Sequence, residues 1–216
     1  MFISRPRMVA VSVPITLIVG LFASNAGAGS SPDAACIIAK AKAFVKCYAA
    51  TVTCWSKDAQ DLLKGGLGTD IDACKNGGIA SCLLAVDSAD AKYGAVCTAA
   101  GAGVGDSGGC DAVSAYAQAD LFTLQGGGET LEGAKCDLKK WKQFAKAFAS
   151  GMKCVEKRRK DDTFDITLCQ STASNKCVIA VAKVTSPNPA ACDGGAGDHG
   201  ACDDAAFSGE TLIGTL

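Results

Sequence analysis

Two stretches decide the fold: residues 36–55 are CIIAKAKAFVKCYAATVTCW, and residues 136–155 are CDLKKWKQFAKAFASGMKCV. In the first, apolar residues recur every three or four positions, at Ile37, Ala41, Phe44, Tyr48, Val52 and Trp55. The second repeats the spacing, at Leu138, Trp141, Phe144, Phe148, Met152 and Val155. This spacing predicts an α-helix with one apolar stripe in each stretch. Lys40, Lys42, Lys46 and their counterparts are expected on the other faces.

The thirteen cysteines extend this correspondence along the chain. Intervals of 18, 8 and 15 positions occur in the same order after Cys36 and again after Cys136. They predict two homologous units, residues 29–133 and 134–216, with six cysteines each. The sets are Cys36, Cys54, Cys74, Cys82, Cys97 and Cys110, then Cys136, Cys154, Cys169, Cys177, Cys192 and Cys202. Cys47 is left over, with Ala147 at its counterpart.

Residues 1–28 have the pattern of a secretory signal peptide. Arg5 and Arg7 precede an apolar run from Met8 to Phe22, and Ala26-Gly27-Ala28 resembles a cleavage site. No second long hydrophobic stretch follows, so we expect no membrane span after cleavage. Secretion to the periplasm or the extracellular space would put every cysteine in an oxidising compartment, where disulfides are the default. Six cysteines allow 15 pairings, and the sequence does not choose among them.

The predicted fold class is all-α, with two disulfide-stapled helical-hairpin units and Gly-rich loops. An antiparallel hairpin would bring Cys54 close to Cys74. The run at 177–181 is β-branched, but the repeated cysteine spacing favours a helix there. In the first unit, Gly77-Gly78 makes the first turn of the corresponding helix, which carries Cys74 and Cys82, doubtful. A third helix, about 112–124 and capped by Asp111, is expected mainly in the first unit, and each unit is expected to have its own core.

Composition excludes several functions. The chain has 21 Lys+Arg and 22 Asp+Glu, so we expect no basic stripe and no nucleic-acid partner. It has one histidine, His199, and no two cysteines closer than seven positions. Thiolate zinc sites and thiol oxidoreductases use closer cysteine pairs. We therefore expect no metal, no cofactor and no catalysis.

One motif resembles an enzyme signature. Gly105-Asp106-Ser107-Gly108-Gly109 is similar to the nucleophile region of chymotrypsin-like serine proteases, where the serine needs a histidine base. Here no histidine precedes Ser107, and His199 stands at its repeat counterpart. Gly103 to Gly108 also matches G-x-G-x-x-G, but without the strand and helix that this motif requires. A Gly-rich loop is the simpler interpretation, and a hydrolase using Ser107 is a distant alternative.

Three further features have a structural and a functional interpretation. The basic cluster Lys153, Lys157, Arg158, Arg159 and Lys160 suits a helix C-terminus, or else an anionic surface. The aromatic residues of the stripes suit a packed core, or else a pocket for a lipid or small apolar ligand. Cys47 is either a free buried thiol or the bridge of a disulfide-linked dimer.

The layout of a signal peptide, a Lys/Ala-rich helix between cysteines, a second cysteine-bearing helix and a Gly-Asp loop resembles a loose group of uncharacterised exported bacterial proteins, cysteine-rich and helical. The resemblance covers most of residues 36–210 and implies no activity. We predict a secreted, non-catalytic structural or protein-interaction module, with an unknown protein or the cell surface as its partner. The alternative is a carrier that binds a lipid or small apolar ligand between its helices.

Overall fold

The computed structural model describes residues 32–95, 97, 105–122, 131–187, 192 and 197–214. These residues contain helices and no strand, so the predicted all-α class is confirmed. The elements are α1 (Pro32–Leu63), α2 (Ile71–Tyr93), α4 (Gly105–Phe122), α5 (Leu131–Lys160), α6 (Ile166–Thr185) and α7 (Gly197–Gly214). The predicted signal peptide, residues 1–28, lies outside the described residues.

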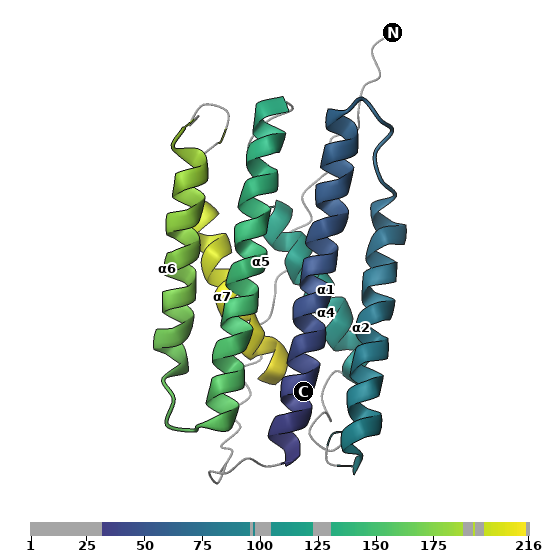
Figure 1. The fold of residues 1–216 in the computed structure, drawn as a ribbon, viewed down its shortest axis with the longest axis vertical. Coiled ribbons are helices and arrows are strands. Elements are labelled where there is room, and N and C mark those ends of the chain that lie inside the picture. Colours follow the sequence, from purple (N-terminus) through teal and green to yellow (C-terminus); the bar gives the residue numbers. More distant parts are fainter. Residues whose placement is uncertain are drawn as a thin grey trace, which may run out of the picture.

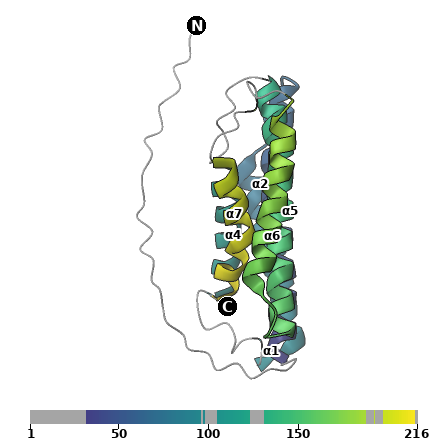
Figure 2. The same ribbon diagram turned by 90° about the vertical axis from the view of Figure 1, so that its left-hand side faces the viewer.

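The helices form two layers (Figures 1 and 2). The long helices lie side by side in the order α6, α5, α1, α2, and each runs antiparallel to its neighbour. The shorter α4 and α7 cross behind this layer and cover one of its faces. α4 packs on α1 and α2, α7 packs on α5 and α6, and α4 also touches α7. No described helix covers the opposite face of the four-helix layer.

The structure has six disulfides, three in each half. None of them joins one half to the other. In the half made of α1, α2 and α4, the bonds are Cys36–Cys97, Cys54–Cys74 and Cys82–Cys110. In the half made of α5, α6 and α7, they are Cys136–Cys192, Cys154–Cys169 and Cys177–Cys202. Each set therefore pairs its first cysteine with its fifth, second with third, and fourth with sixth.

One core serves both halves, so the expectation of a separate core in each unit is wrong. The apolar stripes of α1 and α5 face each other, and their buried residues form one cluster with those of α2, α4, α6 and α7. At its centre the rings of Tyr48 and Phe148 stack with centroids 4.2 Å apart and planes 11° apart. These two residues are counterparts, and a contact between equivalent positions is typical of a two-fold interface.

The third helix differs from the prediction in two ways. It begins at Gly105 instead of near Ala112, and its counterpart α7 is equally long. The glycines that suggested a loop allow close packing instead: a Cβ on Gly109 would lie 2.8 Å from the Phe44 ring. The disulfides of Cys110 and Cys202 fasten α4 and α7 to the neighbouring hairpins.

The second helix of each hairpin begins at an aspartate cap. The Asp70 carboxylate accepts a hydrogen bond from the Ala73 amide, and Asp165 does the same for Leu168. The doubt about Gly77-Gly78 is removed, because α2 runs through both. α6 likewise includes residues 177–181 and ends at Thr185, two residues before Pro187.

The expectation that all lysines of the first stretch lie away from the core is wrong for Lys40 and its counterpart Lys140. Both are buried, and each forms an ion pair with an aspartate from another helix. Lys40 lies three residues after Ile37 and four before Phe44, which places it beside the apolar stripe. Its ammonium group can reach a buried carboxylate because the stem is long and apolar.

Gly151 of α5 packs directly against the backbone of α7. A Cβ at this position would lie 2.0 Å from the Ala206 carbonyl oxygen. We therefore expect Gly151→Ala to lower the melting temperature of the oxidised protein, although alanine favours helices. The matched control is Gly77→Ala in α2, where an added Cβ would meet nothing within 4 Å. This variant should raise the melting temperature, because alanine favours helices more than glycine does. Equal shifts for both variants in thermal unfolding would contradict this packing.

Candidate functional site

Cys47 is the thirteenth cysteine and the one outside the six disulfides; all thirteen lie within the described residues. Its side chain is 1% exposed, and its thiol donates a hydrogen bond to the Cys110 carbonyl oxygen at 3.6 Å. Burial raises the pKa of the Cys47 thiol to about 11, and Asp111 adds to the shift. The thiolate is the reactive form, so the fold keeps this group inert at neutral pH.

A shallow groove of about 350 Å³ lies between α1 and α2 above Cys47. At this groove the two helices pack closely, since a Cβ on Gly78 would lie 3.2 Å from the Ala50 Cβ. The lining residues are Ala43, Lys46, Cys47, Ala50, Gly77, Gly78, Ser81, Cys82 and Ala85. In the other half the cysteine spacing aligns larger residues, Gln143, Thr172 and Lys176, with Ala43, Gly77 and Ser81.

A second groove of about 350 Å³, more open than the first, lies between α6 and α7. α6 contributes both aliphatic and hydroxyl side chains to its walls, and α7 contributes Asp198 and His199. The lining residues are Val178, Val181, Ala182, Thr185, Ser186, Asp198 and His199. No aromatic side chain lines either groove. The aromatic residues of the stripes pack in the core instead, with Tyr48, Phe44, Phe144 and Phe148 at most 1% exposed.

Two buried lysines, one from each central helix, form ion pairs with aspartates of neighbouring helices. Lys40 Nζ lies 3.0 Å from Asp90 Oδ1 of α2. Lys140 Nζ contacts both carboxylate oxygens of Asp198 in α7, at 3.0 and 2.9 Å. The lysines are counterparts but their partners come from different helices. Removing one partner of such a pair leaves a buried charge, which costs about 3–5 kcal/mol.

Asp137 lies next to the Lys140–Asp198 pair and is half-buried. Burial raises its pKa to about 6, the Lys140 ammonium opposes this shift, and the Asp198 carboxylate adds to it. The group therefore exchanges its proton in a pH range where most carboxylates are already ionised. The sequence contains no signal for this shift, because it depends on α7 packing against α5.

Ser174 of α6 contacts Asp203 of α7, and Asp203 in turn contacts His199 on its own helix. The Ser174 hydroxyl donates to Asp203 Oδ1, and His199 Nδ1 lies 3.1 Å from Asp203 Oδ2. Asp203 thus stands between the serine and the histidine. A nucleophilic serine needs the histidine itself as its hydrogen-bond partner, so these contacts orient His199 and do not activate Ser174.

Ser107 lies on the first turn of α4 and not in a loop. Its side chain lies outside the described residues. The basic cluster at the end of α5 is exposed, as its helix C-terminal position predicts. There Arg158 donates to the Phe164 carbonyl oxygen at 3.2 Å, and Lys157 lies over the Phe164 ring.

Within the described part of the chain, one group of three residues has metal-ligand atoms within reach of one another: Cys36, Asp90 and Cys97. Cys36 and Cys97 are joined in a disulfide, so their sulfurs are not thiolates. Asp90 is the partner of Lys40. These three residues are better explained as a structural clamp at the end of the first hairpin.

None of the described helices has the length and apolar character needed to cross a membrane. Comparison with protein families, curated proteins and solved structures finds no match to this chain. The interpretation of function therefore depends on the physical features of the chain itself.

Replacing Asp137 with asparagine tests the proton linkage. The unfolded carboxyl has a pKa near 3.8 and the folded one about 6. The folded state therefore binds the proton more tightly, and the associated stability is lost as pH rises through that window. We expect Asp137→Asn to melt higher than the wild type at about pH 7.5, with the gain disappearing by about pH 4. A gain in melting temperature that does not vary with pH would contradict the raised pKa of Asp137. Asp198→Asn, by contrast, should lower the melting temperature at neutral pH, because it removes the ion-pair partner of Lys140.

The burial of Cys47 predicts a hidden thiol. Treated with N-ethylmaleimide without reductant, the native protein should gain no adduct at about pH 8. In guanidinium chloride it should gain one, detected by intact mass. Cys47→Ala, which restores the residue found at position 147, is the control and should gain none. Labelling of the folded protein, or more than one adduct in denaturant, would be inconsistent with the six disulfides and one buried thiol.

Proposed function

We propose that the protein is an exported, non-catalytic interaction module, built from two homologous units at residues 29–133 and 134–216. The observation that carries the proposal is the pair of disulfide sets with identical connectivity around one filled core. Disulfides form and persist in oxidising compartments, which agrees with the predicted signal peptide. The likeness to exported cysteine-rich helical proteins points the same way.

The disulfide framework supports a role that needs a rigid, durable surface. The six bonds close segments with sequence separations from 15 to 61 residues, and each is worth about 2–4 kcal/mol of stability. Both ends of each hairpin are fastened, and the third helix of each half is fastened to its hairpin. A scaffold of this kind keeps the exposed faces of its helices fixed relative to one another, which favours recognition of a partner.

A carrier for a lipid or small apolar ligand is the alternative, and the packing favours it less. Such a carrier needs an enclosed apolar cavity between the stripes. Tyr48 and Phe148 stack directly on each other where that cavity would lie. The two grooves are open to solvent and lack aromatic walls. A hydrolase using Ser107 gains no support from the contact that His199 makes, because its Nδ1 lies beside Asp203 Oδ2.

The burial of Cys47 also bears on oligomerisation. A thiol that is 1% exposed must leave the core before it can bridge to a second chain. We therefore propose that Cys47 remains a buried thiol and that the dimer bridged by Cys47 does not form in the folded protein.

The experiment is expression of the full chain in a bacterial host, followed by fractionation and intact mass. We expect the protein outside the cytoplasm, starting near Gly29 and lighter than its reduced form by the twelve hydrogens lost in six disulfides. Its monomeric mass should persist without reductant. In the same preparation a fluorescent apolar probe should show no saturable binding.

Other outcomes point elsewhere. Retention in the cytoplasm with free thiols would refute the exported scaffold. Saturable binding of the probe, or a lipid that copurifies in a fixed ratio, would favour the carrier. Labelling of Ser107 by a phosphonate that reacts with activated serines would establish the hydrolase.

A further inference from the structure

The two central helices carry rows of exposed lysines. On α5 the row is Lys135, Lys139, Lys142, Lys146, Lys153 and Lys157, spaced three, four or seven residues apart. On α1 and just beyond its end it is Lys42, Lys46, Lys57 and Lys64. Residues with this spacing share one side of a helix. We call these ten residues the lysine face.

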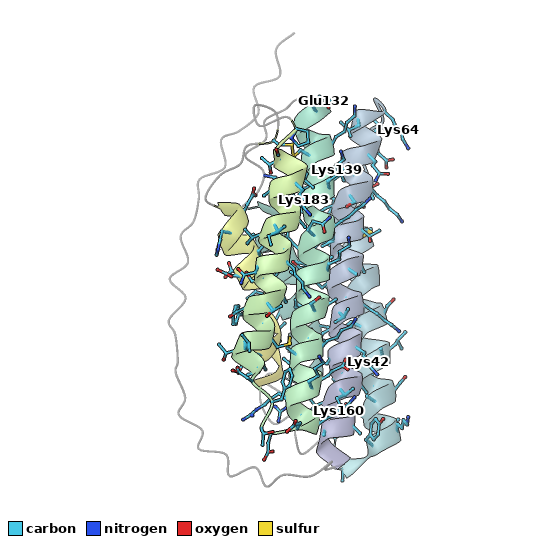
Figure 3. All side chains as sticks on the ribbon, turned by 60° about the vertical axis from the view of Figure 1, so that its left-hand side comes forward. Lys42, Lys64, Glu132, Lys139, Lys160 and Lys183 are labelled. Carbon is cyan, nitrogen blue, oxygen red and sulfur yellow. A yellow bond between two sulfur atoms is a disulfide. The ribbon has the colours of Figure 1, made fainter. Side chains whose placement is uncertain are left out.

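The neighbours of α1 and α5 determine where the lysine face points. α1 is flanked by α2 and α5 and backed by α4, while α5 is flanked by α1 and α6 and backed by α7. The exposed side of each helix is therefore the face of the layer that α4 and α7 leave uncovered (Figure 2). Figure 3 shows Lys42 of α1 and Lys139 of α5, together with Lys183 of α6, spread over the layer.

The charges of the two layers have opposite sign. α5 has ten basic and three acidic residues. α4 has three acidic residues and α7 has four, and neither helix has a lysine or an arginine. The near-zero net charge of the chain therefore conceals a basic layer and an acidic layer. The expectation of no basic stripe is wrong, because a sum over the chain cannot show which helices share a face.

The lysine face makes few ion pairs among the described residues. Among the described residues, the ion pair made by its lysines is that of Lys135 with Glu132, at 2.8 Å on the exposed start of α5. Lys146 contacts Gln143, which is uncharged. A concentration of like charges this close together raises the local potential and attracts anions.

The outer helices add exposed aliphatic side chains to the same layer. Leu84 on α2 is 69% exposed, and Ile179 on α6 is 56% exposed. They occupy the same register, two residues after Cys82 and Cys177. Leu84 also lies seven residues after Gly77, on the side of α2 that borders the groove beside Lys46. The layer thus combines central ammonium groups with apolar side chains at both flanks.

We propose that the lysine face binds peripherally to a membrane surface rich in anionic phospholipids. This inference rests on the proposed exported module and names its partner class. The layer is flat in side view (Figure 2), and α5, with 30 residues, is about 45 Å long. A flat face with lysines and flanking aliphatic residues complements lipid headgroups and the acyl boundary beneath them. The acidic layer of α4 and α7 faces away and sets the orientation.

A nucleic acid is the competing anionic partner, and the face suits it less. Single strands are held mainly by stacking of bases on aromatic side chains. The large exposed aromatic side chain in the described residues is Tyr116, which lies on α4 in the acidic layer. The lysine face is also spread over two helices, α1 and α5, that lie side by side.

The test is vesicle sedimentation with the full chain purified after export. We expect binding to vesicles of phosphatidylcholine with about a third phosphatidylglycerol, and none to pure phosphatidylcholine. Binding should weaken steeply as salt is raised. Lys142→Gln with Lys146→Gln should weaken it about 25-fold, because each lysine near such a surface is worth about fivefold. Leu84→Ser with Ile179→Ser should weaken it at constant charge.

The matched control changes the net charge equally on the other layer. Ala115→Glu in α4 and Gly200→Glu in α7 replace exposed residues, and a Cβ at Gly200 meets nothing within 4 Å. This variant should keep wild-type affinity within about twofold, since its new charges lie beyond a Debye length from the membrane. An equal loss in both variants would show an effect of net charge alone and would overturn the proposal.

Three further outcomes would also overturn it. One is equal binding to neutral and anionic vesicles, and another is tighter binding to single-stranded DNA than to vesicles at the same salt. The third is competition by inorganic phosphate at constant ionic strength, which would indicate a site for the free anion. Intact mass and circular dichroism of the same sample separate the two proposals. If the folded protein has six disulfides but does not bind the vesicles, membrane binding by the lysine face is refuted. That result would not contradict the proposed exported module.

Discussion

The packing of α1 against α5 is the contact on which the rest of the structure depends. Disulfides close each half separately, and none joins the two. The halves cohere through apolar side chains from both, centred on the stacked rings of Tyr48 and Phe148. A stacked aromatic pair adds about 0.5–1.5 kcal/mol to the burial of its surface. Without this interface each hairpin would expose its apolar stripe to water.

The same interface explains the two-layer architecture. When α1 and α5 pair side by side, their outer flanks accept α2 and α6, and the layer has two faces. Covering one face takes two more helices, and Gly109 of α4 and Gly151 of α5 allow the two layers to approach closely. Gly109 against Phe44 and Gly151 against Ala206 are the points where a larger residue would separate the layers. The other face remains available to solvent or to a partner.

Burial sorts the lysines of the central helices into two groups. Lys40 and Lys140 are enclosed and neutralised by aspartates, so they hold the helices in register. The ten residues of the lysine face lie on the uncovered side of the layer. The acidic residues of α4 and α7 lie on the opposite layer, and one of them, Asp198, crosses the interface to meet Lys140. The two-layer arrangement of the helices therefore both buries the core and separates the basic residues of α5 from the acidic residues of α4 and α7.

The sequence by itself determined the helices and the cysteine sets, because these follow from local spacing. Turns of 3.6 residues place Ile37, Phe44 and Tyr48 on one stripe. The two sets of cysteines that the repeated intervals define have the same disulfide connectivity in the two halves. Even the pairing of Cys54 with Cys74 follows from an antiparallel hairpin. The glycines at the start of α4 predict a loop, because glycine disfavours helices, but in the structure they allow the helix to pack against α1.

Tertiary structure alone decided the shared core, the burial of Lys40 and Lys140, the raised pKa of Asp137 and the lysine face. Each depends on which helix lies beside which, and residues 58 positions apart, such as Lys140 and Asp198, meet only once α7 packs on α5. Local periodicity specifies the side of a helix that is apolar, but it does not specify which neighbour covers that side. The free energy that selects the neighbour comes from contacts between segments distant in sequence, which spacing does not encode.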